Sequence, residues 1–237
     1  MSKKIVGIVP FSDPFNTDNV YADKYFLTNT YGQRAVDAGL NPIGVMPVDK
    51  KIQGSVLDLC DCFIIQGGSN IWEYQMEVVE HAVKTGKKLL GICLGCQTIQ
   101  TYFYYAAEAE KAEWKGTVAS YYALNHLWHV DGAPNPALKS VEGHKNWTLP
   151  RGNEDATKHT VFIKEGTHLH RLVGQTEIMG ASLHRFAVAE PAPGVLVNAT
   201  APDGTIEGIE VGENILGTQF HPDADRKLLS IFDFFNE

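Results

Sequence analysis

The sequence predicts an α/β protein: helices cover both faces of a doubly wound, mostly parallel central sheet, and antiparallel strands are added in the C-terminal half. Two observations support this prediction. In the first half, short apolar runs alternate four times with stretches of helical pattern, and unbroken apolar strands are what a parallel sheet covered on both faces requires. In the second half, consecutive β-branched runs are separated by Asp-Gly and Gly-Glu-Asn turns, which is typical of antiparallel strands.

The elements of the first half follow from their composition and from the glycines and prolines that end them. The run KIVGIVP predicts the opening strand because it is short, β-branched and ended by proline. Two predicted helices end at Gly39 and Gly86, because glycine favours the position just past a helix. In chain order we expect a strand at KIVGIVP, a helix over 20–38, a strand at NPIGVMP, a short helix at SVLDLCD, a strand at CFIIQGG, a helix at IWEYQMEVVEHAVKTG, a strand at KKLLGI and a helix after Cys93.

The second half is less regular at first. Residues 114–158 mix Tyr, Trp, His, Pro and Asn, and their pattern predicts no element. After them we expect a strand at HTVFIKEG, a short helix at THLHRLVG, strands at FAVAE, GVLVNAT, TIEGIEV and ILGTQF, and an amphipathic helix at ADRKLLSIFDFFNE. The chain shows no repeat, low-complexity tract or Gly/Ser-rich linker, so we predict one domain, residues 1–237.

Composition excludes several classes of function. The formal net charge of −8 and a pI near 5.6 argue against nucleic acid as a partner, because phosphate binding needs a basic surface. The N-terminal apolar run is too short for a signal peptide or a membrane span, so no membrane association is expected. Four cysteines in a chain without a leader indicate free thiols and a cytoplasmic location.

The stretch LLGICLGCQ, residues 89–97, carries the clearest chemical signal. A buried parallel strand that ends in a tight turn before a helix places the turn residue at the carboxyl edge of the sheet, where ligands bind. Gly91 and Gly95 flank Cys93 at two residues on either side, as small residues flank the nucleophile in a G-x-S-x-G elbow. The helix N-terminus would favour the thiolate of Cys93, so this residue is a candidate nucleophile.

A cysteine nucleophile needs a base and donors for an oxyanion. In GTQFHPDAD, an apolar strand ends before His221, and Asp223 lies two residues later, able to reach back and fix the imidazole tautomer. FIIQGG brings Gly67 and Gly68 to the end of another strand, where bare backbone N–H groups can face the same edge.

Together these segments resemble the class I glutamine amidotransferase superfamily, and most closely its stand-alone hydrolases, the γ-glutamyl-γ-aminobutyrate hydrolase-like (C26-type) cysteine peptidases. The family pattern of G-x-C-x-G, a Gln two residues later, an upstream G-G turn and a late H-P-E is matched here by 91–95, Gln97, the two glycines at 67–68 and His-Pro-Asp at 221–223. ASLHRFAV, 181–188, is similar to the family's S-x-H-H-Q segment. The resemblance implies a flavodoxin-like, class I glutamine amidotransferase-like fold.

The resemblance also implies a role for each matching residue. Cys93 would be the nucleophile, His221 the general base and Asp223 the residue that orients it. The backbone N–H groups of Gly68 and Leu94 would form the oxyanion hole. The glutamyl side of the pocket would be lined by Gly67, Gln97, Ser182 and His184. No cofactor and no metal are implied.

The sequence departs from the family pattern in two places. The third position of the triad is Asp rather than Glu, one methylene shorter, so Asp223 reaches His221, Asp225 takes its place, or the histidine is poorly held. The family's N-V-x-x-G-G-T-L-x-Q-D segment is replaced by TYFYYAAEAEKAEWKG. This second departure affects the identity of the substrate more than the type of reaction.

Other interpretations of the same residues remain open. Cys93 and Cys96 have the spacing of a redox pair, although a thioredoxin-like chain carries that pair near its first strand. Cys60 and Cys62 lack two further zinc ligands, which favours core packing. The pairs His126/His129 and His168/His170 have no carboxylate or cysteine at ligand spacing, which favours surface histidines. The aromatic residues of TYFYYAAEAE predict a buried helix face, with a pocket wall or a homodimer contact as alternatives.

The sequence therefore predicts a cysteine hydrolase that cleaves the γ-glutamyl amide bond of a small γ-glutamyl compound through a thioester. A glutaminase component that supplies ammonia to a separate synthase is the first alternative. A non-catalytic binding protein of the same fold is the second, because of the two departures from the family pattern.

Overall fold

The computed structural model describes residues 3–12, 24–125, 135–144 and 157–237. Its centre is a nine-stranded sheet with the order β4-β1-β5-β6-β13-β12-β11-β8-β9. The first five strands in this order are parallel: β4 (Asn41–Gly44), β1 (Ile5–Val9), β5 (Cys62–Ile65), β6 (Lys88–Ile92) and β13 (Ile215–Thr218). Their connectivity is the flavodoxin-like order 2-1-3-4-5 of doubly wound folds.

The other half of the sheet is antiparallel. β12 (Ile206–Val211), β11 (Leu196–Thr200), β8 (Lys158–Ile163) and β9 (Glu177–Ala181) each pair antiparallel with the preceding strand in the sheet order, starting from β13. The predicted fold class, a doubly wound sheet extended by antiparallel strands, is therefore confirmed. Two small two-stranded sheets stand apart from it, formed by β2 (Phe11–Ser12) with β3 (Tyr25–Phe26) and by β7 (Leu138–Ser140) with β10 (Phe186–Val188).

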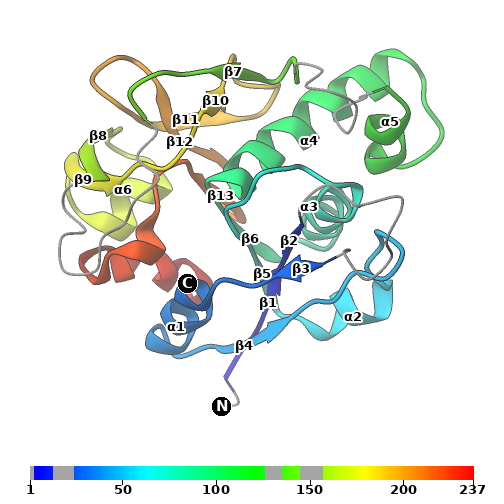
Figure 1. Cartoon of the computed structure of the whole chain (residues 1–237), viewed down its shortest axis with the longest axis horizontal. Coiled ribbons are helices and arrows are strands. Elements are labelled where there is room, and N and C mark those ends of the chain that lie inside the picture. Colours follow the sequence, from blue (N-terminus) through cyan, green and yellow to red (C-terminus); the bar gives the residue numbers. More distant parts are fainter. Residues whose placement is uncertain (1–2, 13–23, 126–134, 145–156) are drawn as a thin grey trace.

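Helices cover both faces of the sheet (Figure 1). One face carries α2 (Gly54–Leu59), α3 (Glu73–Thr85), α4 (Leu94–Lys111) and α5 (Val118–Asn125), and the other carries α1 (Asn29–Asp37), α6 (His168–Val173) and the C-terminal helical segment η4 (Arg226–Asn236). A short 3-10 helix, η3 (Pro222–Ala224), precedes η4. Among the described residues, no helix combines the length and the apolar character needed to cross a membrane.

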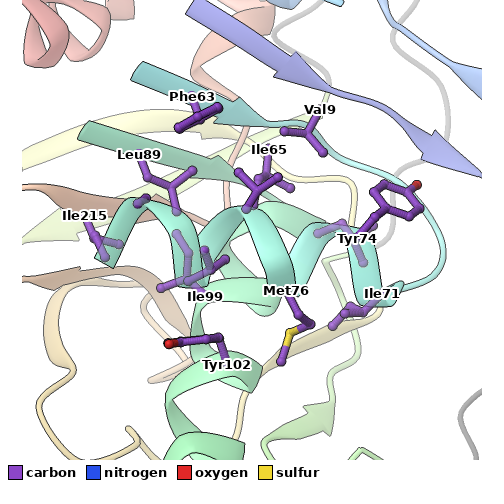
Figure 2. Close-up of a cluster of buried hydrophobic side chains, with 14 of the residues drawn as sticks. Val9, Phe63, Ile65, Ile71, Tyr74, Met76, Leu89, Ile99, Tyr102 and Ile215 are labelled. Atoms are coloured by element: carbon purple, nitrogen blue, oxygen red, sulfur yellow. The ribbon is translucent and has the colours of Figure 1, made fainter. Parts of the chain in front are cut away.

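Alternate residues of the central strands supply the two cores. Phe63, Ile65 and Leu89 point to the face covered by α3 and α4 and belong to the same buried cluster as Ile99 and Tyr102 (Figure 2). The intervening strand residues, such as Ile64 and Leu90, contribute instead to the core beneath α1 and η4. This double-sided burial explains why the strands are apolar throughout rather than alternating.

The predicted helix over 20–38 is wrong in its first part. The helix begins at Asn29, and Tyr25–Phe26 forms β3, while residues 13–23 lie outside the described part of the chain. β3 pairs with Phe11–Ser12, and the rings of Phe11 and Phe26 stack with centroids 5.2 Å apart. Pairing with a segment distant in sequence overrides the local helical pattern here.

Two further differences lie in the second half. Glu177–Ala181 forms the edge strand β9, which the sequence pattern did not predict. The predicted C-terminal amphipathic helix consists of 3-10 turns with a kink at Leu228. The phenylalanines of that segment, Phe232, Phe234 and Phe235, are fully buried against the sheet, so packing of these rings determines its path more than regular helix geometry does.

Candidate active site

The predicted site residues meet because neighbouring parallel strands end at the same edge of the sheet. β5 ends just before Gly67 and Gly68, β6 just before Cys93 and β13 just before His221. The first turn of α1, which contains Thr30 and Tyr31, lies at this edge as well, since both residues line the pocket found there. This is the edge at which open α/β sheets bind their ligands.

Cys93 occupies a sharp turn between β6 and α4. Its backbone has φ 55° and ψ −104°, a conformation that non-glycine residues rarely adopt, and its N–H donates to the carbonyl of Thr218 at 2.7 Å. Such strain persists only where the surroundings enforce it, and it is concentrated at functional sites. The flanking glycines allow this turn: a Cβ on Gly91 would lie 2.5 Å from the backbone of Gly95, and one on Gly95 would lie 2.1 Å from the carbonyl oxygen of Ile65.

His221 and Asp223 are joined directly. Nδ1 of His221 lies 3.0 Å from Oδ1 of Asp223, and both side chains are almost completely buried. The second carboxylate oxygen of Asp223 accepts from the Thr30 hydroxyl at 2.7 Å, and its backbone carbonyl accepts from Nε of Arg34 at 3.1 Å. The turn of η3 thus brings the shorter Asp within reach of the imidazole, and α1 fixes its orientation.

The same contacts hold the imidazole in its charged form. Burial lowers the pKa of His221, but the charges of Asp223 and Cys93, and hydrogen bonds with both side chains, outweigh it and raise this pKa from 6.5 to about 10. The interaction with Cys93 means that the thiol group lies beside the imidazole. The imidazole therefore lies between the carboxyl group of Asp223 and the sulfur of Cys93, both of which favour its charged form.

Asp225 does not take this position. Its Oδ2 pairs with Nζ of Lys158 at 2.6 Å, and its Oδ1 accepts from the backbone N–H of Lys227 at 2.9 Å. These bonds, led by the one with Lys158, outweigh the effect of burial and lower the pKa of Asp225. Of the two carboxylates that the sequence left open, the structure brings Asp223 to the histidine.

The two glycines after β5 differ in what their N–H groups do. The Gly67 N–H donates to the hydroxyl of Tyr31 at 2.9 Å, and a Cβ on Gly67 would lie 3.0 Å from Cε1 of His221. Among the described residues, the N–H groups of Gly68 and Leu94 have no hydrogen-bond acceptor, which leaves them available to an oxyanion. Tyr31 stays neutral, because burial and then the charges of Asp223 and Cys93 raise its pKa well above its usual value.

These groups open into a cavity of about 570 Å³. Its volume suits a small molecule. It is lined by Phe11, Thr28, Thr30, Tyr31, Gly67, Gly68, Ser69, Cys93, Gln97, Leu183, His184, Arg185, Phe186, His221, Asp223 and Ala224.

Of the residues expected to line the glutamyl side, Gly67, Gln97 and His184 do line the cavity, but Ser182 does not. The Ser182 hydroxyl donates to the carbonyl of His144 at 3.0 Å, so the expected substrate contact is not supported and its neighbour Leu183 lines the cavity instead. Nε2 of Gln97 donates to the carbonyl of Phe186 at 2.7 Å and to Oε1 of Gln219 at 3.1 Å.

The other cysteines behave as core residues. All four cysteines are free and buried, so Cys93 and Cys96 form no disulfide. Burial raises the pKa of Cys60, that of Cys62 to about 12, and that of Cys96 well above its usual value, which keeps these three thiols protonated near neutral pH. The redox-pair interpretation is therefore not supported, and the packing interpretation of Cys60 and Cys62 is confirmed.

The remaining candidates are structural or outside the described residues. His126 and His129 lie outside the described part of the chain. The prediction of a surface histidine is wrong for His168, which is buried. Its Nε2 contacts the carboxylate of Glu237 and its ring lies 3.8 Å from Glu213, so it ties α6 to neighbouring acidic side chains. On α4, Tyr102 and Tyr105 are buried, as predicted for the helix face in TYFYYAAEAE.

Thr30 and Tyr31 were missed by the sequence interpretation. Both lie on the first turn of α1, and the helix pattern alone does not distinguish them from neighbouring polar residues. Their place in the chain could have indicated them: α1 follows the strand β1, so its N-terminal turn lies at the carboxyl edge of the sheet.

Comparisons with known proteins identify a family and several relatives to which the chain is similar. The family model for peptidase C26 matches residues 129–223, a segment that contains His221 and Asp223 but not Cys93. A CTP synthase of Chlamydia pneumoniae is 24% identical over 81% of this chain, and the match covers 36% of that relative, so the chain spans about a third of its length. A glutamine amidotransferase-like protein of Rickettsia prowazekii is 23% identical, with 93% of this chain and 91% of the relative covered.

Solved structures share the fold. A GMP synthase-like protein of Thermoplasma acidophilum superposes with a TM-score of 0.64 and 16% identity over 99% of this chain and 93% of its own. A glutamine amidotransferase of Thermotoga maritima gives a TM-score of 0.58 and 11% identity over 100% of this chain and 84% of its own. These neighbours show that the chain has the fold of glutamine amidotransferases, and the family match over residues 129–223 makes it similar to the class I glutamine amidotransferase-like superfamily.

Proposed function

We propose that this protein is a cysteine hydrolase that cleaves the γ-glutamyl amide bond of a small γ-glutamyl compound. One observation carries the proposal: Cys93 lies in a strained turn beside the buried His221–Asp223 pair and lines a cavity of about 570 Å³. A thiolate at a helix N-terminus beside an imidazolium is the arrangement of an activated nucleophile.

In the first half of the proposed reaction, the thiolate of Cys93 attacks the γ-carbonyl carbon. The carbonyl oxygen becomes an oxyanion, which accepts hydrogen bonds from the N–H groups of Gly68 and Leu94. As the C–N bond breaks, His221 gives its proton to the leaving amine, and a γ-glutamyl thioester on Cys93 remains. Thr30 and Asp223 keep the imidazole oriented during this transfer.

In the second half, water attacks the thioester. Neutral His221 takes a proton from the water, the carbon–sulfur bond breaks, and glutamate leaves. The proton on His221 and the negative charge on Cys93 restore the starting ion pair. Asp223 orients the imidazole and stabilises the imidazolium in both halves of the reaction.

A glutaminase role is the second candidate, because relatives with this level of similarity include a protein named CTP synthase and one described as part of a GMP synthase. In that role the same chemistry would act on glutamine, and the ammonia would pass to a separate synthase. The hydrolase and the glutaminase would differ in the amine that leaves, and the same residues would carry out the reaction in both.

The test is a panel of γ-glutamyl amines and glutamine, assayed with the purified chain for release of glutamate and of the amine. Turnover of a γ-glutamyl amine well above that of glutamine supports the hydrolase. Preference for glutamine supports the glutaminase role. Binding of the compounds without turnover by the wild type, equal to that of Cys93→Ala, would replace both with a binding protein.

A further inference from the structure

A second cluster of reactive side chains lies beside the cavity and is not used by the proposed chemistry. His144, His159, His184 and Glu207 gather around one point. The topology brings them together: β13 and β9 end at the carboxyl edge of the sheet, while the antiparallel strands β12 and β8 begin there. Glu207 follows Ile206, the first residue of β12, His159 follows Lys158, the first residue of β8, and His184 lies after the end of β9.

Three imidazoles surround one carboxylate oxygen. Oε1 of Glu207 lies 3.2 Å from Nδ1 of His144, 3.2 Å from Nε2 of His184 and 3.4 Å from Nε2 of His159. The ligand atoms of His144, His184 and Glu207 all lie within 4.8 Å of one another. Two ligands of a tetrahedral zinc ion with bonds of about 2.0–2.1 Å are themselves about 3.3 Å apart. The separations of Glu207 Oε1 from Nδ1 of His144 and from Nε2 of His184, both 3.2 Å, are compatible with that spacing, and His159 lies beside this group at 3.4 Å.

In His144 and His184, the ring nitrogen that faces away from Glu207 already has a hydrogen-bond acceptor. Nε2 of His144 lies 3.0 Å from Oδ2 of Asp203, whose other oxygen accepts from the N–H of Thr205 at 2.9 Å. Nδ1 of His184 lies 3.0 Å from the carbonyl of Phe186. Metal-bound histidines in proteins typically donate their second N–H to a carboxylate or a backbone carbonyl in this way.

These hydrogen bonds leave the ring nitrogens nearest Glu207 able to bind a cation. When His144 donates to Asp203, and His184 to Phe186, the neutral rings present lone pairs at the nitrogens nearest Glu207. A lone pair facing a carboxylate oxygen is unfavourable, and a metal ion between them satisfies all of these atoms. The alternative is a second proton on each ring, and titration with a metal ion distinguishes the protonated rings from a metal site.

Two buried atoms of the cluster also lack partners. Among the described residues, Oε2 of Glu207 and Nε2 of His159 have no hydrogen-bond partner, and the Glu207 side chain is 0% exposed. A fully buried carboxylate with an unsatisfied oxygen is costly unless it is paired with charge or coordinates a metal. This is a second observation, independent of the spacing, that points to a bound cation.

We propose that His144, His159, His184 and Glu207 bind a divalent transition metal ion, for which Zn²⁺ fits best because imidazole and carboxylate ligands suit it. This differs from the sequence interpretation, which implied no metal: the four residues are scattered from 144 to 207 and meet only through the strand order. The ion would fix the segment 183–186, which lines the cavity, and would take no part in bond cleavage.

The test is titration of Zn²⁺ into the chelator-treated full chain by calorimetry, in a Cys93→Ser background so that the nucleophile cannot bind the ion. One equivalent should bind, and His144→Ala should weaken it at least tenfold. Asp203→Asn, which removes the acceptor from the ligand His144, should weaken it about 10–100-fold. His170→Gln, a histidine on α6 outside the cluster, is the matched control and should bind like the background chain.

Co²⁺ in place of Zn²⁺ provides an independent readout, since four-coordinate Co²⁺ absorbs visible light and thiolate ligands add a separate charge-transfer band. We expect the visible absorption of four-coordinate Co²⁺ without the thiolate charge-transfer band. His159→Gln is the variant most tolerant of change, because its side chain is 24% exposed, and it should fold and bind more weakly. Absence of stoichiometric binding, or binding that His144→Ala, His159→Gln and Asp203→Asn leave unchanged, would overturn the proposal and leave doubly protonated histidines in its place.

Discussion

Cys93 differs from the other three cysteines in surroundings rather than in exposure. All four are buried, but Cys93 alone among them lies beside His221 and at the start of a long helix. Chemical reactivity of a thiol follows the thiolate, which an imidazolium and a helix N-terminus both stabilise. The thiols of Cys60, Cys62 and Cys96 are held protonated by burial.

This contrast predicts the site of alkylation. Iodoacetamide at neutral pH should modify Cys93 before Cys60, Cys62 or Cys96, as measured by mass spectrometry of the digested protein over time. Cys93→Ser should abolish turnover, and Cys96→Ser should reduce it little. Turnover that survives Cys93→Ser would contradict the proposed nucleophile, and a large loss with Cys96→Ser in a folded protein would revive the redox pair.

The two carboxylates after His221 should differ in their effect on catalysis. His221→Ala removes a proton-transfer group usually worth about 10²–10⁴ in rate. Asp223→Asn should cost less than this, because it removes only orientation and charge stabilisation. Asp225→Asn should leave turnover near the wild-type value, since that carboxylate pairs with Lys158. Single mutants compared under saturating substrate check this order, and a severe Asp225→Asn would reverse the assignment.

The pH profile gives a second test of Asp223. Its charge is one of the interactions that raise the pKa of His221 to about 10. Removing that charge lowers the pKa of the imidazole, so the imidazolium loses its proton at lower pH. In Asp223→Asn we therefore expect the alkaline limb of kcat/KM to move to lower pH relative to the wild type. A limb that stays in place would mean that Asp223 does not act on His221.

Among the elements, the β6–α4 turn depends on close contact between backbones. Gly95 lies on the first turn of α4 against the end of β5, and the space for a side chain there is taken by the carbonyl of Ile65 at 2.1 Å. Backbone atoms of a central strand cannot move aside as a flexible side chain can. The glycine is therefore required by packing, in addition to any role in catalysis.

Gly95→Ala should destabilise the protein by about 1–3 kcal/mol or prevent folding, as overpacking does in a close-packed interior. Gly54→Ala is the matched control: Gly54 starts α2, and a Cβ there would meet nothing within 4 Å. Urea unfolding of both variants gives the comparison. Equal stabilities would show that the strand and helix can separate at this turn without cost.

For the molecule as a whole, the His221 interactions link folding to pH. The pKa of His221 rises from 6.5 to about 10 on folding, so the folded state holds this proton more tightly than the unfolded chain. A group whose pKa rises on folding stabilises the folded state fully at pH values below its pKa in the unfolded chain. This stabilisation is lost as the pH rises through the pKa of the group in the folded protein. The relevant window therefore runs from the ordinary pKa of 6.5 to the folded value of about 10.

We expect the free energy of unfolding of the wild type to exceed that of His221→Gln most strongly at pH values below the ordinary histidine pKa of about 6.5. This difference should shrink through the window, by at most about 1.4 kcal/mol per pH unit. Denaturant unfolding of both proteins at several pH values measures it. A difference that is the same at every pH would mean that the imidazole is not held as a cation in the folded protein.

Local sequence patterns are enough to predict the alternation of strands and helices, the doubly wound sheet and the positions of Cys93, His221 and the two glycines after β5. Each of these features depends on an apolar run and on the glycine, cysteine or histidine that ends it. Parallel strands necessarily bring such ends to one edge, so the convergence of the site could be predicted as well. The start of α1 could not be predicted, because the strand β3, which precedes it, forms only through pairing with β2.

The choice between Asp223 and Asp225 depends on tertiary contacts, since the two carboxylates differ in the distant residue that they bind, Thr30 or Lys158. Tertiary contacts also turn Ser182 toward His144 and away from the cavity. The histidine and glutamate cluster is the clearest case. Its members come from the ends and starts of antiparallel strands, and the place of β8 beside β11 and β9 depends on long-range pairing that no local pattern encodes.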